Sequence, residues 1–179
     1  MRRLRATNRA ILKVRIVNQL FALASALAMM IAFPLAAIAQ QAVVGVASVI
    51  DGDTIEIHGT RLRLYGIDAP ESRQQCLLAD QTPWRCGQQS AMALAGRLDR
   101  ATISCFPRDR DRYGRVVAVC FKGGEDVNRW MVTNGWAVAF RRYSLDYVAD
   151  EDRARRGRLG VWSGSFDMPW NWRARETVH

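Results

Sequence analysis

The sequence predicts a mainly β domain with helices, of the α+β class, built as a five-stranded OB-fold barrel with about three helices. Short β-rich runs, separated by turns that contain Gly and Asp, dominate the chain just after residue 42. Apolar residues at helical spacing occur between and after the later runs. Short strands with interspersed helices are typical of this small barrel. The roughly 140 residues from 40 onward are enough for one such domain with its own core.

The first three predicted strands form a meander. Their ranges are 43–50, 54–58 and 61–67, with turns at 51–53 and 59–60. In the third strand, alternation puts Arg61, Arg63 and Tyr65 on one face. Leu62 and Leu64 point to the other face. Arg63 therefore has a face on which to meet a ligand.

The sequence of the remainder of the domain predicts three helices and further strands. Residues 88–100 carry Ala91, Leu94, Ala95 and Leu98 at helical spacing, which predicts a helix that faces the core. Two more helices are predicted at 125–133, ended by Asn134-Gly135, and at about 145–156. Strands are predicted at 103–106, 116–121 and, as a short piece, 136–140, with a charged segment at 108–115 between the first two.

The first 39 residues predict a secretory signal peptide. Six basic residues precede an apolar run at 20–39, and Ala37-Ile38-Ala39 offers a cleavage site before Gln40. The alternative is an uncleaved membrane anchor, because a run of about 20 apolar residues can span a bilayer. Pro34 and the alanine-rich end of the run favour cleavage. Cleavage leaves a domain at 40–179, with 163–179 as a C-terminal extension, exported to the periplasm or out of the cell.

Loss of this segment changes the meaning of the net charge. The whole chain has 26 basic and 17 acidic residues, a formal net charge of +9. Six basic residues and no acidic ones lie before Gln40, which leaves 20 basic against 17 acidic residues, or +3. Global charge is therefore weak evidence for a nucleic-acid partner.

Four cysteines, all after residue 40, predict disulfides in an exported domain: Cys76, Cys86, Cys105 and Cys120. Three pairings are possible. The preferred one joins Cys76 to Cys86 and Cys105 to Cys120, because the second pair lies on two successive apolar strands that can form a hairpin. A zinc site is disfavoured, since no C-x-x-C spacing occurs and the chain has two histidines.

Carboxylates and arginines in separate pieces of the chain fit one chemistry. Asp53, Asp68 and Glu71 offer the oxygen ligands that calcium or magnesium prefers. Arg63 and Arg115 offer planar guanidinium groups, which suit a phosphate better than a lysine does. Together they indicate a metal-assisted phosphodiesterase.

These residues lie in sequence motifs that resemble the staphylococcal nuclease (thermonuclease) family, over roughly residues 43–163. The motifs are DGDT at 51–54, RLYGIDAPE at 63–71, DRYGR at 111–115, VNRWMVTNGWA at 127–137 and GVWS at 160–163. The ordered combination is far more specific than any one motif. The resemblance implies an OB-fold and a nuclease that leaves 3′-phosphate products.

The resemblance also implies a set of metal ligands. Asp53 and Asp68 would bind one ion through their carboxylates, and Ala69 would bind it through its backbone carbonyl. This oxygen-rich shell favours calcium over magnesium or manganese. Ala69 stands where the archetype of the family has threonine, so a hydroxyl that supports the site is missing. Asp51 is interpreted as a turn former.

The family's remaining roles carry over by position. Glu71 would be the general base, and Arg63 and Arg115 would stabilise the charge that builds up on the phosphate. Tyr113 and Tyr143 would lie beside the bound nucleotide. Arg112 would add a phosphate contact, although the alternating charges at 108–112 are also typical of a solvated loop. Trp170 and Trp172 lie beyond the family's pattern and receive no role.

The resulting hypothesis is an exported, calcium-dependent nuclease that acts on DNA and RNA with little sequence preference. It would be a monomer without a stable protein partner, and away from the membrane once the signal is cleaved. One alternative is a non-catalytic OB-fold module that binds nucleic acid or oligosaccharide. Another is a membrane-anchored interaction protein, which requires an uncleaved signal.

Export predicts a mature chain that starts at Gln40 and has no free thiol, because signal cleavage and an oxidising compartment act together. The intact mass of the exported protein should be that of residues 40–179 with all four cysteines oxidised. A retained leader, or labelling of all four cysteines by a thiol reagent in the native protein, would contradict this hypothesis.

Overall fold

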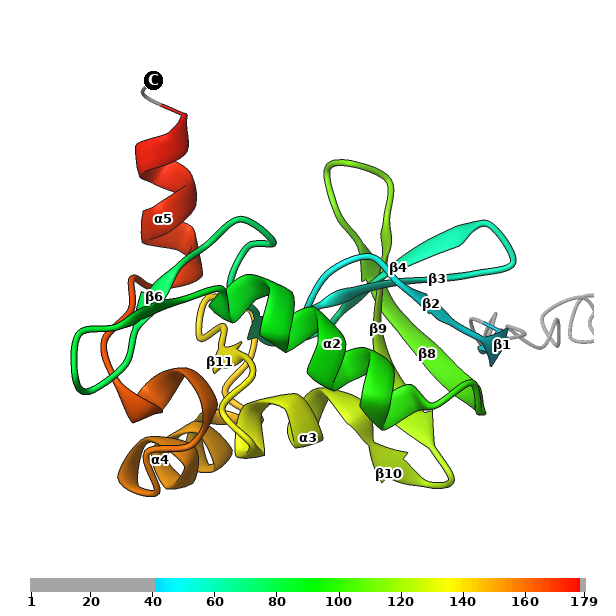
Figure 1. The fold of residues 1–179 in the computed structure, drawn as a ribbon. Helices are drawn as coiled ribbons and strands as arrows, with labels where there is room; N and C mark the ends of the chain where they lie inside the picture. The colour runs from blue at the N-terminus through cyan, green and yellow to red at the C-terminus, as the bar shows by residue number, and fades with distance from the viewer. Residues whose placement is uncertain (1–40, 178–179) are drawn as a thin grey trace, which may run out of the picture. The chain divides into compact units, whose positions relative to one another are not determined.

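The structure is a computed structural model, and it describes residues 41–177 (Figure 1). The predicted signal peptide at 1–39 and its cleavage site before Gln40 lie outside the described residues. Between residues 41 and 177, no helix is both long and apolar enough to cross a bilayer.

A strongly curved sheet forms a nearly closed barrel and confirms the predicted OB-fold-like α+β class. Its strands follow the order β1-β8-β9-β4-β3-β2, with β10 added beside β9. All pairings are antiparallel except that of β4 with β9, which is parallel. The strands are β1 (Val43–Val46), β2 (Ser48–Val49), β3 (Thr54–Ile57), β4 (Thr60–Leu64), β8 (Thr102–Arg110), β9 (Val116–Lys122) and β10 (Glu125–Asp126).

Two predicted strands are each divided in the structure, and both divisions shape the barrel. The run at 43–50 breaks at Ala47, so that β1 pairs with β8 while β2 pairs with β3. The run at 61–67 breaks at Gly66, whose φ of +73° strongly favours glycine. The chain then enters β5 (Ile67–Asp68), which pairs with β11 (Val138–Ala139) away from the main sheet.

The charged segment at 108–115 is partly strand, which corrects the prediction of a loop. Strand β8 continues to Arg110 after an irregularity between Pro107 and Asp109, and pairs with β9 to its end. Backbone pairing does not require apolar side chains when these point to solvent, as Arg108, Asp109 and Arg110 do. The hairpin therefore projects beyond the barrel and carries Asp111 to its tip (Figure 1).

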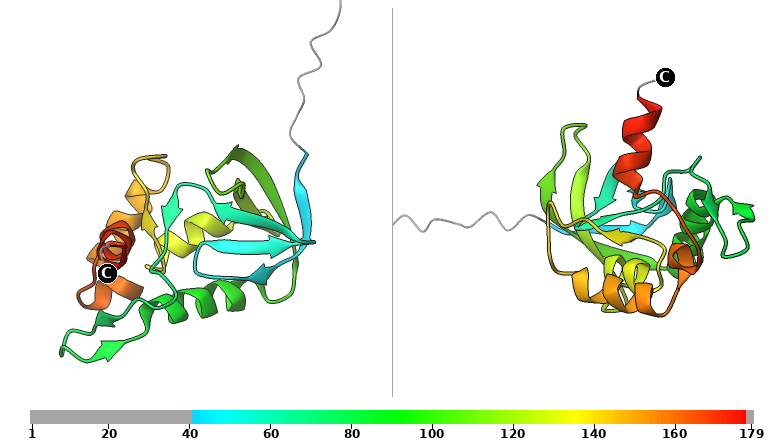
Figure 2. Two further views of the ribbon diagram at one scale, coloured as in Figure 1. Left: turned by 90° about the horizontal axis from the view of Figure 1, so that it is seen from above. Right: turned by 90° about the vertical axis from the view of Figure 1, so that its left-hand side faces the viewer.

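Four α-helices occur in the described residues, one more than predicted. They are α2 (Cys86–Leu98), α3 (Val127–Thr133), α4 (Val148–Arg156) and α5 (Pro169–Glu176), with a short 3₁₀ turn η1 (Gly160–Ser163). The unpredicted α5 lies in the C-terminal extension, and it stands out from the domain on the same side as the β8–β9 hairpin (Figures 1 and 2). A small hairpin of β6 (Cys76–Leu77) and β7 (Pro83–Trp84) was also not predicted.

The core lies between the barrel strands and helices α2 and α3. Leu94 and Leu98 of α2 are buried as predicted, but Ala95 is exposed, because Ser90 and Gly87 complete the inner face instead. Val127, Met131 and Val132 of α3 join the same cluster. The alternation predicted for β4 is confirmed, since Leu62 and Leu64 are both buried.

Asn128 ties helix α3 to the strands that carry the functional residues. Its buried side-chain amide donates to the carbonyls of Tyr65 (3.0 Å) and Ala118 (3.1 Å) and accepts from the amide of Cys120 (3.1 Å). A buried polar side chain that makes three such bonds fixes its surroundings more firmly than an apolar contact does. The turn at Gly66 is thereby held in register with β9.

Both predicted disulfides are present. Cys76 is bonded to Cys86, and Cys105 to Cys120, and the described residues include no free cysteine. The second bond joins opposite residues of β8 and β9 in the buried core, as the hairpin argument predicted. The first ties the β6–β7 hairpin to the start of α2.

The core disulfide should contribute substantially to stability. Cys105→Ala combined with Cys120→Ala opens a loop of 15 residues and should lower the free energy of unfolding by about 3 kcal/mol, because the unfolded chain gains entropy. Urea unfolding measures the change. The matched variant Cys76→Ala with Cys86→Ala opens a loop of 10 residues and should cost slightly less. An unchanged urea midpoint in the Cys105 and Cys120 variant would contradict the prediction.

Candidate functional site

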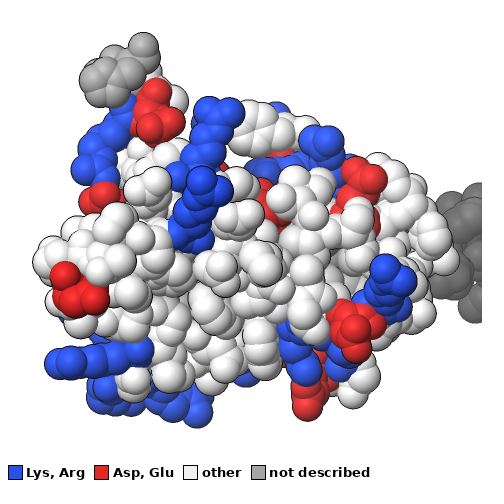
Figure 3. Space-filling model, viewed as in Figure 1, with Lys and Arg blue, Asp and Glu red and all other residues white. Residues whose placement is uncertain are grey.

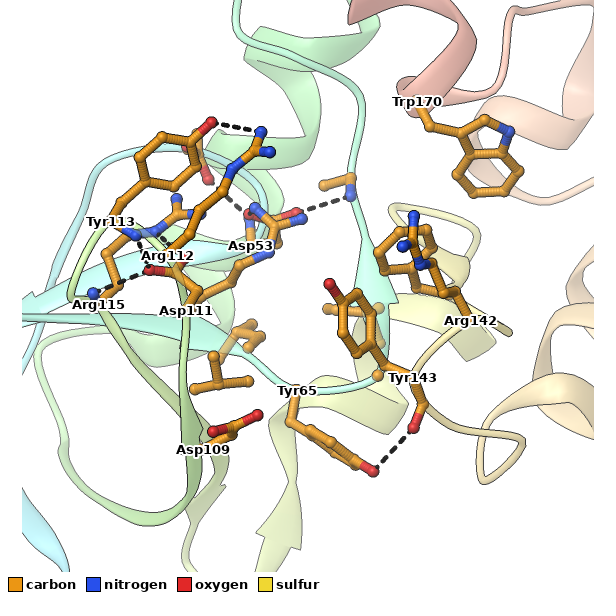
Figure 4. A pocket seen from close by; sticks show the side chains of 18 of the residues that line it. Asp53, Tyr65, Asp109, Asp111, Arg112, Tyr113, Arg115, Arg142, Tyr143 and Trp170 are labelled. Atoms are coloured by element: carbon orange, nitrogen blue, oxygen red, sulfur yellow. Dashed lines mark hydrogen bonds and ion pairs between the residues drawn. The ribbon is translucent and has the colours of Figure 1, made fainter.

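A pocket of about 630 Å³ opens where the barrel, the β8–β9 hairpin and α5 meet. Its walls collect nearly all the residues that the sequence assigns to function: Asp53, Arg63, Ala69, Glu71, Arg112, Tyr113, Arg115 and Tyr143. Figure 4 shows Tyr113 and Arg112 on one side of the pocket, and Tyr143, Arg142 and Trp170 on the other. Asp68 is the exception, since it does not line the pocket.

Asp53 directly precedes β3, and its own turn and three donors fix its position. Its amide donates to the carboxylate of Asp51 (3.0 Å), which closes the DGDT turn. One carboxylate oxygen accepts from the hydroxyl of Thr54 (3.0 Å) and from Arg63 (3.0 Å). The other accepts from the amide of Ala69 (3.0 Å), so that the carboxylate joins β3 to the segment after β5.

Asp68 lies at the end of β5 with no exposed surface. Arg63 donates to its Oδ1 at 2.7 Å. Arg173, from helix α5, donates to both carboxylate oxygens, at 3.0 Å and 2.7 Å. Burial raises the pKa of Asp68, and the hydrogen bond from Arg173 and the charge of Arg63 act in the opposite direction.

Arg63 bridges the two aspartates from strand β4. Its two terminal nitrogens bond to Asp53 and Asp68 separately, at 3.0 Å and 2.7 Å. Burial alone would lower the pKa of Arg63, but the charges of the two aspartates raise it. The guanidinium therefore stays charged beside the pocket.

Arg115 is aimed by Asp111, at the tip of the β8–β9 hairpin. The Asp111 carboxylate accepts from the amides of Tyr113 (2.9 Å) and Arg115 (3.0 Å), and from the Arg115 side chain at Nε (2.6 Å). These bonds hold the pKa of Asp111 below its usual value, against the effect of burial. The terminal nitrogens of Arg115 are left to face the pocket, where one lies 3.5 Å from the hydroxyl of Thr54.

Aromatic side chains form two opposite walls. The Tyr113 ring is largely exposed, and the guanidinium groups of Arg112 and Arg115 lie 4.8 Å and 5.5 Å from its centre. On the other wall, Phe140 contacts Tyr143 and stacks on Trp170, with ring centres 5.1 Å and 5.6 Å apart. Of these rings, those of Tyr113 and Tyr143 are exposed and can stack on bases.

Glu71 directly follows Pro70, and contacts of its backbone with Gln74 and Gly87 fix its position. Its amide donates to the side-chain carbonyl of Gln74 (3.2 Å). A Cβ atom on Gly87, at the start of α2, would lie 1.7 Å from the Glu71 carbonyl oxygen, so only glycine permits this close approach. One carboxylate oxygen accepts from Arg173 at 2.6 Å.

The carboxylate and carbonyl oxygens at the site are the type of ligand that a hard divalent cation prefers. Burial and the charge of neighbouring Asp53 raise the pKa of Asp51 to about 6, as expected where carboxylates crowd together and a cation would relieve the repulsion. In residues 41–177, no three acidic, histidine or cysteine side chains form a ready-made metal cluster. Two carboxylates and a backbone carbonyl would not require one, because waters can complete the oxygen shell of a divalent cation.

The sequence missed four residues that build the site. Asp111 orients Arg115, Phe140 and Trp170 form one wall, and Arg173 bonds to Asp68 and Glu71. Pro169 at the first position of α5 was the available signal for a helix start. No spacing in the sequence indicates that this helix turns Arg173 toward the site.

Comparisons with known proteins identify a family and several relatives of this chain. A family model described as "Staphylococcal nuclease homologue" matches residues 61–164, more than half of the chain. The chain is 42% identical over 127 residues to "Succinoglycan biosynthesis protein ExoI" of Rhizobium meliloti, covering 69% of this chain and 66% of that protein, just under two thirds. It is 35% identical to an "Uncharacterized endonuclease" of Escherichia coli, over 73% of this chain and 84% of the relative. A "Micrococcal nuclease" of Shigella flexneri is 34% identical, over 72% and 78%.

Asp111 should prove essential to the order of the hairpin tip. Asp111→Ala removes the acceptor of the Tyr113 and Arg115 amides. Loss of hydrogen bonds to a charged group should speed the exchange of these two amide protons roughly tenfold or more. Hydrogen exchange at Tyr113 and Arg115 measures the effect, with the Ala69 amide as internal reference. Asp109→Ala, an exposed change on the same hairpin, should leave all three rates unaltered. Equal rates in wild type and Asp111→Ala would contradict this prediction.

Proposed function

Because the chain belongs to the staphylococcal nuclease family, we propose that it is an exported, calcium-dependent nuclease that hydrolyses phosphodiester bonds in DNA and RNA with little sequence preference. Membership of the family and its nuclease relatives make the chain a nuclease-type hydrolase. The finer proposal rests on one observation. Carboxylates and arginines from the turn before β3, from β4, from the segment after β5 and from the β8–β9 hairpin converge on one pocket.

Asp53, Asp68 and the backbone carbonyl of Ala69 would hold the cation. Nucleases of this family are generally metal-dependent, and an all-oxygen shell completed by waters suits calcium better than the strict octahedron of magnesium. The bound ion would supply Lewis-acid help and neutralise charge on the phosphate. Ala69 offers its carbonyl without the hydroxyl of a threonine, which would weaken support of the site.

Glu71 would accept the proton of the attacking water. Its carboxylate is about one-third exposed on the pocket wall, so that it reaches solvent while its backbone is held by Gln74. As the water oxygen bonds to phosphorus, the 5′ P–O bond breaks and a 3′-phosphate product remains. The proton passes from Glu71 to solvent or to the departing oxygen.

Arg63 and Arg115 would hold the phosphate oxygens from two sides. Arg115 is oriented through its Nε by Asp111, which leaves its terminal nitrogens for an anion. A guanidinium group already in place, as that of Arg115 is, stabilises the extra charge of the five-coordinate transition state at little cost in reorganisation. Arg63 must exchange an aspartate oxygen for a phosphate oxygen, which a cation on the aspartates would favour.

Substrate contacts would come from both walls of the pocket. Tyr113 and Arg112 would lie along one side of the bound nucleotide and Tyr143 along the other. Elsewhere, basic and acidic side chains are interspersed on the face shown in Figure 3. Recognition concentrated in the pocket, through phosphate and base stacking, agrees with weak sequence preference.

The disulfides support export, because such bonds persist in oxidising compartments. A signal peptide at 1–39 with cleavage before Gln40, and a monomeric mature domain at 40–179, are parts of the same proposal. The periplasm or the medium would be its place of action. DNA and RNA would be its partners.

A non-catalytic OB-fold module is the second candidate, favoured by one relative whose name refers to succinoglycan biosynthesis. Such a module would bind an oligosaccharide in the same pocket. It would have no need of two buried aspartates, a glutamate and two arginines close together. In this chain Asp53, Glu71 and both arginines line one cavity, and the buried Asp68 pairs with Arg63. Cleavage of nucleic acid separates the two candidates.

Single-turnover cleavage of plasmid and single-stranded DNA, with calcium or a chelator, tests the proposal. If the arginines act in the transition state, Arg63→Ala and Arg115→Ala should each slow cleavage roughly 10² to 10³-fold and lower kcat more than they raise KM. Glu71→Gln should slow cleavage severely and keep much of the DNA affinity. The exposed change Arg158→Ala is the control and should cleave normally. Near wild-type turnover in all three site variants would refute the residue assignment, and absence of cleavage by wild type would favour the binding module.

A further inference from the structure

Arg173 covers the carboxylate that the cation would need. One terminal nitrogen bridges Asp68 Oδ1 (3.0 Å) and Glu71 Oε1 (2.6 Å), and the other bonds to Asp68 Oδ2 (2.7 Å). With Arg63 also on Oδ1, both oxygens of Asp68 carry guanidinium partners. The carboxylate has no exposed surface and does not line the pocket, although Arg63 and Arg173 do.

Helix α5 is docked in a way that makes this contact specific. Trp170 stacks on Phe140, with rings 5.6 Å apart and 22° from parallel, and Pro169 is buried. The fully buried Gln74 donates to the Asp167 carbonyl (2.7 Å) and accepts from the Glu71 amide (3.2 Å). One side chain therefore links the loop of Glu71 to the segment that leads into α5.

We propose that Arg173 is an internal counter-cation, which occupies Asp68 and Glu71 in the resting protein and must be displaced from Asp68 before a divalent cation binds there. The proposal rests on the proposed function, in which Asp68 is a cation ligand. Arg173 lies outside residues 61–164, which the family model matches. It thus belongs to the part of this chain that follows the common domain.

The charges support competition between the guanidinium and the ion. A divalent ion on Asp68 would meet the positive charge of Arg173 at contact distance, and two like charges at such a separation repel strongly even at an intermediate dielectric constant. Loss of the guanidinium would remove this repulsion and leave Asp68 short of a partner, which a cation would supply. Both effects tighten calcium binding.

Release of Arg173 does not require α5 to undock. About a third of its side chain is exposed, so the guanidinium can swing toward solvent while Trp170 and Pro169 hold the helix. The long arginine side chain has the rotational freedom for this movement. Glu71 loses the same partner at the same moment, which frees its carboxylate to accept a proton.

Calcium titration by isothermal calorimetry tests the proposal on the purified protein, with the wild type and three variants. Arg173→Gln keeps hydrogen-bonding capacity without charge and should bind calcium roughly tenfold tighter or more. Arg173→Lys keeps the charge and loses the bidentate bond. Its calcium affinity should therefore lie between those of the wild type and Arg173→Gln. Arg175→Gln removes an arginine from the same helix that pairs with Asp167, and should match the wild type.

Affinity in Arg173→Gln and Arg173→Lys equal to that of the wild type would overturn the proposal. Weaker calcium binding would also overturn it and would make Arg173 a support of the cation site. Calcium-dependent cleavage by the wild type, measured in parallel, tests the proposed nuclease function separately from the role of Arg173. If the wild type cleaves only with calcium and the variants bind no tighter, the function stands and the role of Arg173 falls. If no variant binds calcium and cleavage ignores a chelator, both fall.

Discussion

A carboxylate without contact to water needs partners for its charge, and the arrangement of the site follows from how Asp68 finds them. Burial of an ion is costly unless opposite charges and hydrogen bonds compensate it. Arg63 arrives from β4 and Arg173 from α5, and together they occupy both oxygens. The C-terminal helix is thereby held against β4 and β5, which lie about 105 residues earlier in the chain, around one negative charge. A cation would bind to the same negative charge. The Asp68 carboxylate therefore serves both the stability of the resting protein and the binding of a cation.

The barrel supplies the constraint that makes this possible. The turn at Gly66 ends β4 and starts β5 almost at once, so Arg63 and Asp68 come close although they lie on different sheets. The parallel pairing of β4 with β9 places Arg63 opposite Val117. Arg115, two residues before Val117, then reaches the same pocket, with Asp111 to aim it. Asn128 locks this corner through the carbonyls of Tyr65 and Ala118.

The sequence predicted the features that depend on short-range patterns. The alternation of Leu62 and Leu64 against Arg63, and the hairpin that brings Cys105 to Cys120, required neighbouring residues only. Prediction from the sequence failed where pairing between distant segments determines which residues form a strand. Ala47 divides a continuous β-rich run, because its two halves find different partner strands. Charged residues at 108–110 form strand because their backbone pairs with β9, although nothing in their composition favours it.

The candidate site shows the same division. Motif spacing led to Asp53, Arg63, Glu71 and Arg115, which the fold brings to one pocket. Arg173 could not be found in this way, because its role arises from how Trp170 and Gln74 dock a helix that has no counterpart in the recognised motifs.

The most direct test of the account is a crystal structure of the protein with calcium and a short oligonucleotide that resists hydrolysis. We expect one cation on the carboxylates of Asp53 and Asp68 and the carbonyl of Ala69, a phosphate between Arg63 and Arg115, and Arg173 released from Asp68. A cation bound elsewhere, with Asp68 still paired to both arginines, would contradict it.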